Sequence, residues 1–211
     1  MSSFFNDPHS ERGFPCPHNH FGISDYNRLQ PIEAPLVAKR GGELEDQGIT
    51  GDFTAAHLRA VHRYLFQDVF PWGGELRVVN IAKGNQPFAP AQFAAAALED
   101  ALVKLKREEL LSGLTAAEFS GRAAFYLGEI NAVHAFREGN GRAQREFVRQ
   151  VALHAGHPLS WHGFTQQEMI EASILSHAKG DNTGLAAIIE AALFSTRERS
   201  KRKVRAEKED D

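Results

Sequence analysis

Residues 134–145 bring together, within one short stretch, the residue types that bind phosphate groups. Gly139 and Gly141 let backbone N–H groups approach a ligand closely. They lie at the expected start of a helix, where unpaired N–H groups and the helix dipole attract anions. Arg142 and Arg145 are three residues apart, so on a helix they share a face and can hold two phosphates together. The pattern therefore predicts a site for linked phosphates.

Two other residues of this segment suit a transfer reaction. Glu138 offers a hard oxygen ligand beside the phosphate site, and Mg²⁺ usually takes one or two carboxylates together with substrate phosphates. Histidine titrates near neutral pH, so His134 at the entrance to the loop is suited to accept a proton from an attacking hydroxyl. The segment lacks the Gly-x-x-x-x-Gly-Lys-Ser/Thr pattern of a Walker A loop and has no serine or cysteine beside its histidine. It therefore predicts direct transfer to an incoming acceptor.

Each of these features also has an ordinary structural explanation. A single histidine at a helix end is often a cap or a core residue. A Glu-Gly-Asn-Gly run can be a plain turn between helices, and two arginines three residues apart usually lie on a solvated helix face. The occurrence of all these features together, in this order and at one turn, favours the functional interpretation.

The composition is ordinary for a globular domain. Of the 211 residues 42% are hydrophobic, and no run approaches the ~18 apolar residues that a membrane span requires. Acidic and basic residues nearly cancel to a net charge of -3, which argues against direct nucleic-acid binding.

Cys16 is the only cysteine and the N-terminus does not resemble a secretory signal, so we expect a cytoplasmic protein without disulfides. We interpret the charged tail, residues 197–211, as a solvated end, with nucleic-acid contact as the alternative.

Hydrophobic periodicity predicts a mainly α-helical chain around residues 134–145. Thr115 and Thr165 each begin a capping box with a glutamate three residues later, which marks the start of a helix. The expected helices cover residues 53–66, about 91–109, 115 to about 133, about 140–154, a stretch from 165, and a stretch from about 183.

Two further regions break this helical pattern. The β-branched stretch at residues 75–83 is followed by Gly84-Asn85, which predicts a strand and a hairpin turn. We expect the first forty or so residues to be rich in loops, because prolines interrupt any early helix at positions 8, 15, 17, 31 and 35.

At residues 134–145 the chain resembles the Fic family of protein AMP-transferases, whose signature is His-Pro-Phe-x-Asp/Glu-Gly-Asn-Gly-Arg-x-x-Arg. Every defining position matches except the second, where Ala135 replaces a proline that would stiffen the loop entry. The resemblance covers about residues 17–194, including the run from Pro71 to Arg77 and the run from Asn80 to Phe88. It implies a Fic-fold helical bundle with one small β-hairpin, called the flap.

The expected organisation is a single Fic domain over residues 1–196 followed by the charged tail. Within this domain, the resemblance places an N-terminal extension at about residues 1–24 and the flap at about residues 75–89. The signature motif occupies residues 134–145.

The resemblance implies a protein adenylyltransferase that moves AMP from ATP to a tyrosine, serine or threonine hydroxyl of a target protein, with Mg²⁺ as cofactor. His134 would be the general base and Glu138 the Mg²⁺ ligand. Gly139, Asn140 and Gly141 would form an anion hole for the nucleotide phosphates. Arg142 would also hold phosphate, and Arg145 would bind the γ-phosphate. The flap would align an extended target segment main chain to main chain, with Ile81, Lys83 and Phe88 as the positioning residues.

The resemblance also implies partners. Many relatives carry an inhibitory helix with the pattern Ser/Thr-x-x-x-Glu-Gly/Asn, and this sequence has no such pattern. We therefore expect a stand-alone toxin that a small antitoxin protein inhibits in trans, with the B subunit of DNA gyrase and topoisomerase IV as targets. The alternatives are transfer of phosphate or phosphocholine, and a nucleotide-sensing module without turnover. Gly141 favours AMP over phosphate, since phosphate-transferring relatives typically have lysine there.

Overall fold

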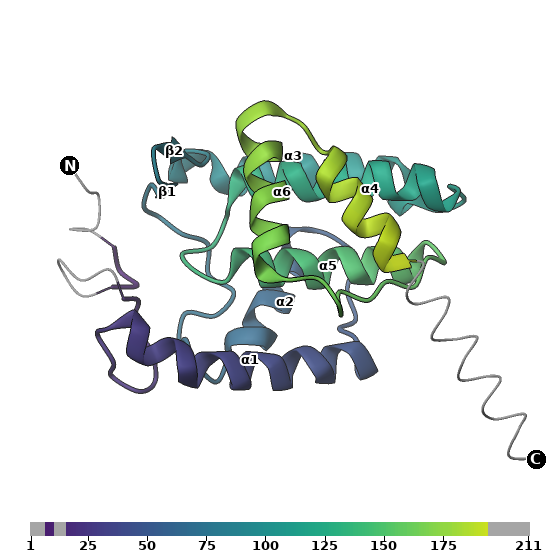
Figure 1. Cartoon of the computed structure of the whole chain (residues 1–211). Coiled ribbons are helices and arrows are strands. Elements are labelled where there is room, and N and C mark those ends of the chain that lie inside the picture. Colours follow the sequence, from purple (N-terminus) through teal and green to yellow (C-terminus); the bar gives the residue numbers. More distant parts are fainter. Residues whose placement is uncertain (1–6, 11–15, 194–211) are drawn as a thin grey trace, which may run out of the picture. The chain divides into compact units, whose positions relative to one another are not determined.

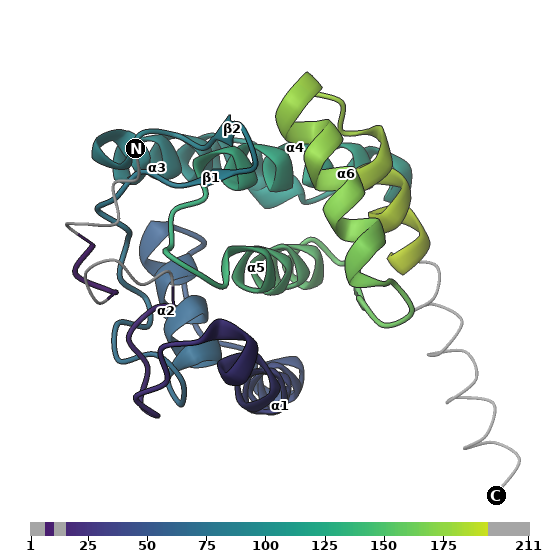
Figure 2. The ribbon, with the colours of Figure 1, turned by 60° about the vertical axis from the view of Figure 1, so that its left-hand side comes forward.

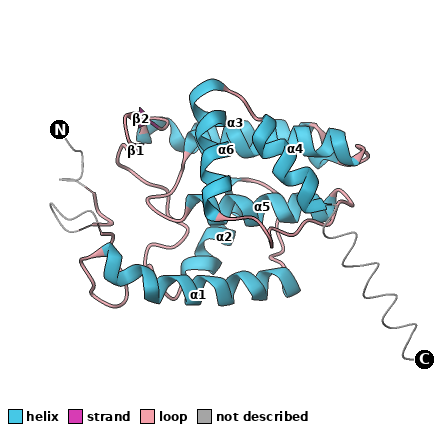
Figure 3. Cartoon of the chain, in the orientation of Figure 1, coloured by secondary structure: helices cyan, strands magenta, loops and turns pink. Residues whose placement is uncertain are grey.

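The structure is a computed structural model that describes residues 7–10 and 16–193, so the predicted tail at residues 197–211 lies outside the described residues. The described residues are mainly helical, and their strands form one small hairpin, as expected (Figures 1 and 3). Every predicted site residue lies in the first of two compact units. The first unit comprises Met1–Lys104 and Ile130–Phe147, and the second comprises Leu105–Glu129 and Val148–Asp211.

Helix α1 (Tyr26–Gln47) contains two of the prolines that predicted loops. Asp25 caps it by accepting the N–H of Asn27 at 2.9 Å. Pro31 and Pro35 inside the helix each remove a hydrogen bond, a change that costs about 3 kcal/mol in a helix interior. Both prolines are exposed, so water can satisfy the carbonyls they leave, while the opposite face is buried. The prediction of early loops was wrong here; the buried face consists of Leu29, Glu33, Val37 and Leu44.

Helix α2 (Ala55–Phe66) packs against α1 within the first unit (Figure 2). Arg40 of α1 donates to both carboxylate oxygens of Asp68, at 2.7 and 2.9 Å, and so joins α1 to the residues that follow α2. The helical spacing predicted from residue 53 onward is confirmed, because α2 buries Leu58, Val61, Leu65 and Phe66.

The hairpin consists of β1 (Ala82–Lys83) and β2 (Gln86–Pro87), which pair in antiparallel register. Gly84 in the predicted turn has a φ of 59°, which glycine adopts easily. The strand predicted from residue 75 forms only at its end. Arg77 donates its backbone N–H to the carbonyl of Ala135 at 2.9 Å, and not to a neighbouring strand.

Three longer helices follow the predicted bounds: α3 (Ala91–Arg107), α4 (Ala116–Val133) and α5 (Asn140–His154). The capping box before α4 is confirmed. The N–H of Thr115 donates to the carboxylate of Glu118 at 2.9 Å, and the N–H of Glu118 donates back to the hydroxyl of Thr115 at 3.4 Å. The motif loop therefore lies between the end of α4 and the start of α5.

The second unit holds most of α4 and the part of α5 that follows Phe147. It also holds η2 (Glu109–Leu111), α6 (Gln166–Lys179) and helical residues 183–193. The capping box at Thr165 is confirmed at the start of α6. Within the part of the chain that the structure describes, every helix is too short or too polar to cross a membrane.

Candidate active site

His134 follows the last residue of α4, Val133, and has an unusual backbone conformation. Its φ is 48°, in the left-handed region, although its N–H still donates to the carbonyl of Ile130 at 3.1 Å. The imidazole stacks on Phe88 of the flap, with ring centroids 3.8 Å apart. Its Nδ1 lies 3.2 Å from the carbonyl of Asn131, which can only accept, so in the neutral ring Nδ1 carries the proton. Nε2 then bears the lone pair and is the atom that can accept a proton.

The loop after His134 is closed by Asn140, the first residue of α5. Its Oδ1 accepts the N–H of Phe136 at 2.8 Å, and its Nδ2 donates to the carbonyl of the same residue at 2.7 Å. The N–H of Ala143 donates to the carbonyl of Gly139 at 3.2 Å, so the N–H groups of residues 140–142 have no acceptor within the helix. The Asn140 side chain thus fixes the loop, while the backbone at the helix start can face an anion.

His62 of α2, to which sequence reasoning gave no role in chemistry, holds the carbonyl of Glu138. Its Nδ1 accepts the N–H of Gly74 at 2.9 Å, so its Nε2 carries the proton and donates to that carbonyl at 2.9 Å. The ring stacks on Phe136 with centroids 3.9 Å apart. Burial, helped by the nearby charge of Arg142, lowers the pKa of His62 to about 4. His62 is therefore a neutral anchor for the loop at physiological pH.

Gly139 occupies a position that admits no side chain. Its φ is 77°, and a Cβ built there would lie 2.3 Å from the ring of Phe66. Its N–H donates to Oε1 of Glu138 at 2.9 Å. Gly141 is less constrained, since a Cβ there would lie 3.3 Å from Nη1 of Arg145. One glycine thus gives room to an aromatic ring and the other to an arginine.

Arg142 lies between an aromatic ring and two carboxylates. Its guanidinium carbon is 4.7 Å from the ring centroid of Phe66. Its Nη2 is 2.5 Å from Oε1 of Glu33, a buried residue of α1, and 3.9 Å from Oε1 of Glu138. The contact with Glu33 is an ion pair between a guanidinium and a fully buried carboxylate. Glu33 was missed from the sequence, where nothing local links it to the motif.

Arg145 lies three residues further along α5, as the spacing predicts. Burial, and after it the charge of Arg142, lowers the pKa of its guanidinium. The two arginines therefore place unfavourably close positive charge at the start of one helix. An anion bound there would relieve this repulsion.

Glu138 is the predicted metal ligand, and its surroundings fit Mg²⁺. Its side chain is 35% exposed and lies at the helix start, with one oxygen accepting the N–H of Gly139. One carboxylate is a usual protein contribution to Mg²⁺, which takes its remaining ligands from substrate phosphates and water. The described residues contain no group of three or more His, Cys, Asp or Glu side chains able to hold a metal ion.

The predicted flap residues lie at different depths. Phe88 stacks on the imidazole of His134, and its N–H donates to the carbonyl of Ile81 at 3.2 Å. Ile81 is half-buried, whereas Lys83 and the rest of both strands are exposed. The base of the flap therefore contacts His134 while its strands face solvent.

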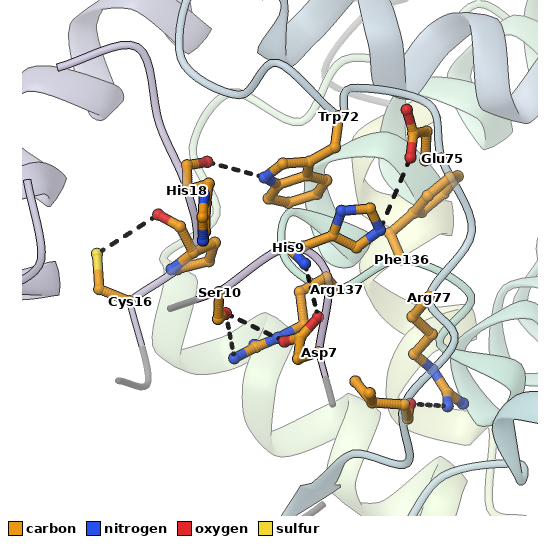
Figure 4. Close-up of polar contacts among 12 residues, drawn as sticks. Asp7, His9, Ser10, Cys16, His18, Trp72, Glu75, Arg77, Phe136 and Arg137 are labelled. Atoms are coloured by element: carbon orange, nitrogen blue, oxygen red, sulfur yellow. Dashed lines mark hydrogen bonds and ion pairs between the residues drawn. The ribbon is translucent and has the colours of Figure 1, made fainter. Parts of the chain in front are cut away.

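A short N-terminal segment, which sequence reasoning left without a role in the motif, is bound to it (Figure 4). The buried carboxylate of Asp7 accepts from Nε of Arg137 at 2.6 Å and from the hydroxyl of Ser10 at 3.0 Å. Burial alone would raise the pKa of Asp7, but the hydrogen bonds from Arg137 and from the backbone outweigh it, so the pKa is lowered. The indole of Trp72, which lies in the turn before the flap, donates to the carbonyl of His18 at 2.8 Å and so connects the segment around His18 to that turn.

Comparison with known proteins gives this chain a family and several named relatives. A model of the Fic/DOC family matches residues 52–152. "Protein adenylyltransferase VbhT" from Bartonella schoenbuchensis is 40% identical over 184 residues, which are 87% of this chain and 38% of VbhT. "Probable protein adenylyltransferase Fic" from Escherichia coli (strain K12) is 37% identical over 182 residues, which are 86% of this chain and 90% of that protein. The chain thus spans well under two thirds of VbhT and most of the second relative.

Solved structures agree with the sequence relatives. The BepC protein, a VirB-translocated effector of Bartonella tribocorum with bound AMPPNP, superposes with a TM-score of 0.79 at 26% identity, over 87% of this chain and 95% of that chain. Two further curated relatives, 36% and 35% identical, also carry the name of protein adenylyltransferase, qualified as probable. The motif, the helical fold with its hairpin and these similarities show that the chain belongs to the Fic/DOC family.

Proposed function

We propose that this chain is a protein adenylyltransferase, which transfers AMP from ATP to a tyrosine, serine or threonine hydroxyl of a target protein. The observation that carries the proposal is the arrangement around His134. Its Nε2 bears the lone pair, and the loop that it begins leads directly into the helix start that carries Arg142 and Arg145. The names of the curated relatives and the AMPPNP bound to BepC support it.

In the proposed reaction, the hydroxyl oxygen of the target attacks the α-phosphorus of ATP while Nε2 of His134 takes the hydroxyl proton. The bond from the α-phosphorus to the oxygen that bridges to the β-phosphate breaks, so AMP stays on the target and pyrophosphate leaves. The N–H groups of residues 140–142, with Arg142 and Arg145, stabilise the charge on the phosphate oxygens. Mg²⁺, when held by Glu138, would neutralise further phosphate charge.

Gly141 supports AMP transfer over phosphate transfer. A residue without Cβ leaves room for the α-phosphate at the helix start, where backbone N–H groups bind anions. A side chain there would also crowd Arg145, since a Cβ would lie 3.3 Å from Nη1 of that arginine. Arg145 is the residue that we propose for the γ-phosphate, so a larger residue 141 would disturb both ends of the triphosphate.

The finer biological role extends this proposal. The chain would act in the bacterial cytoplasm as a toxin that a small antitoxin protein inhibits in trans. Its targets would be the B subunit of DNA gyrase and topoisomerase IV. The missing Ser/Thr-x-x-x-Glu-Gly/Asn pattern supports inhibition in trans. Incubation of purified gyrase B subunit with the protein, ATP and Mg²⁺ tests the target, and intact mass of the subunit reports the group added.

The test of the reaction is a labelling experiment in bacterial lysate. The purified protein is incubated with Mg²⁺ and with ATP labelled on either the α- or the γ-phosphate, beside a His134→Ala control. We expect label on a lysate protein from α-labelled ATP only, and none with the control. Label from γ-labelled ATP would instead establish phosphate transfer. ATP binding without any label would favour the nucleotide-sensing alternative.

A further inference from the structure

We propose that Arg77 is a positioning residue that fixes the flap and His134 relative to each other, so that a target bound by the flap meets the base. The inference rests on the proposed adenylyl transfer for its functional consequence. Arg77 is fully buried in the segment that precedes the flap, and Figure 4 shows its guanidinium among the polar contacts of the first unit. In the sequence, Arg77 stands out only as the last residue of the run from Pro71 that resembles the Fic family.

On one side, the guanidinium of Arg77 holds the turn that carries the base. Its Nε donates to the carbonyl of His134 at 2.7 Å, and its Nη2 donates to the carbonyl of Val133 at 3.0 Å. Its backbone N–H donates to the carbonyl of Ala135 at 2.9 Å. Three successive carbonyls around a residue with a φ of 48° are therefore fixed by one side chain and its own backbone.

On the other side, the same guanidinium holds both ends of the flap. Nη1 donates to the carbonyl of Val79 at 2.8 Å, and Nη2 donates to the carbonyl of Ala89. The N–H of Ala89 donates to the carbonyl of Ala132 in the last turn of α4 at 3.1 Å. Phe88, next to that end, stacks on the imidazole of His134. The flap is thus anchored at its ends to the residues that orient the base.

The chemistry of arginine explains why this position suits it. A guanidinium carries five donors in a rigid planar fork, whereas a lysine ammonium carries three donors at one point. Arg77 uses the fork to reach four carbonyls from two segments of the chain. Burying a cation is costly, and burial lowers the pKa of Arg77. An apolar residue could fill the volume, but it could not hold the flap ends and the base turn together.

The phosphate side of the site is held by other residues. His62 binds the carbonyl of Glu138, and Asn140 closes the loop on Phe136. None of the described hydrogen bonds of Arg77 reaches residues 136–142. Loss of the Arg77 fork should therefore disturb the flap and the base while leaving the nucleotide site intact.

The test compares the full chain with Arg77→Lys, which keeps the charge and removes the fork. We expect the Kd for AMPPNP, measured by calorimetry, to stay within about threefold of wild type. We expect kcat/KM for AMP transfer to fall by about 10²-fold, because misplacing a reacting group by about 1 Å has an effect of that size. Hydrogen exchange should quicken in residues 79–89 and 132–135 and stay unchanged in residues 136–142. Arg40→Lys is the control, because Arg40 binds Asp68 and Glu43 and no part of the motif or flap.

Each result decides the inference. Unchanged transfer and unchanged exchange in Arg77→Lys would overturn it, as would loss of AMPPNP binding in parallel with transfer. If Arg77→Lys does not fold, Ala89→Pro removes the single N–H bonded to Ala132 and should reproduce the split between binding and transfer on a smaller scale. If wild type transfers no AMP, the proposed function fails, while the exchange pattern still decides whether Arg77 joins the flap to His134.

Discussion

The loop at residues 135–140 and the flap at residues 79–89 both contact His134 or its neighbours, yet they are held in opposite ways. The loop is fixed along its length by buried groups: the Asn140 side chain is bonded to Phe136, and His62 is bonded to the carbonyl of Glu138. The flap has only a two-residue ladder with exposed strands, and its ends carry the anchoring bonds.

The difference matches two tasks. A phosphate site gains most when its N–H groups are already in place before the ligand arrives, because no reorganisation is then needed. A surface that pairs with an extended segment of another protein must keep its main-chain edge exposed and tolerate different side chains. The molecule therefore combines a preorganised loop with an end-anchored flap. Changes in the loop should cost nucleotide binding and stability, whereas changes in the flap should cost transfer.

The largest effect is expected from Gly139→Ala in the loop, compared with the same substitution in the flap, Gly84→Ala. Both glycines have positive φ, 77° and 59°, but only Gly139 faces a neighbour, Phe66, at 2.3 Å. We expect Gly139→Ala to lower the free energy of unfolding by about 4 kcal/mol, because it adds overpacking to backbone strain. We expect Gly84→Ala to lower it by about 1 kcal/mol, because it adds backbone strain alone. Urea denaturation measures both, and calorimetry should show weakened AMPPNP binding only for Gly139→Ala. Equal losses would contradict the contrast between the two regions.

The next effect concerns pH and His62. Its folded pKa of about 4 lies below the ordinary 6.5, so the unfolded chain takes up the proton first as the pH falls. The stability contributed by neutral His62 is complete above pH 6.5 and is lost between pH 6.5 and 4, about 3 kcal/mol over that window. Urea denaturation across this range should give a shallower pH dependence for His62→Gln than for wild type. Identical slopes would show that His62 does not anchor the loop as a neutral ring.

A smaller effect is expected at the N-terminal segment that supports the loop. Asp7→Asn replaces the buried carboxylate that binds Arg137 and should cost about 2 kcal/mol of unfolding free energy near neutral pH. Because the pKa of Asp7 is lowered, the stabilisation is present above its ordinary pKa of 3.8 and disappears as the pH falls further. Wild type and variant should therefore differ at pH 7 and converge in acid. A constant difference at every pH would assign the effect to packing instead of charge.

Local patterns in the sequence predicted much of this architecture. The start of α5 at Asn140 and the capping box at Thr165 depend on residues within one turn of each other, so they were visible in the sequence. Helix α1 was missed because its prolines are visible in the local sequence and predict loops. The burial of its opposite face depends on the rest of the first unit, which the local sequence does not show. Pro31 and Pro35 are tolerated because they face solvent.

The contacts that hold the candidate site were beyond local reasoning. His62 and Glu138, Glu33 and Arg142, and Arg77 and His134 are each far apart in the sequence and meet only in the fold. A histidine, a glutamate and an arginine in ordinary helices or loops carry no signal of such partners. The motif therefore indicated the groups that we propose to react, while the residues that hold them in place required the structure.

The central claim is that His134 acts on the target hydroxyl at a nucleotide site that other residues build. The most direct test is to measure AMPPNP affinity and AMP transfer together for His134→Ala, with His20→Ala as an exposed histidine control. The account predicts an AMPPNP affinity within about threefold of wild type and transfer lower by about 10²- to 10⁴-fold, the range for loss of a general base. Transfer that persists in His134→Ala, or binding that falls together with transfer, would contradict it.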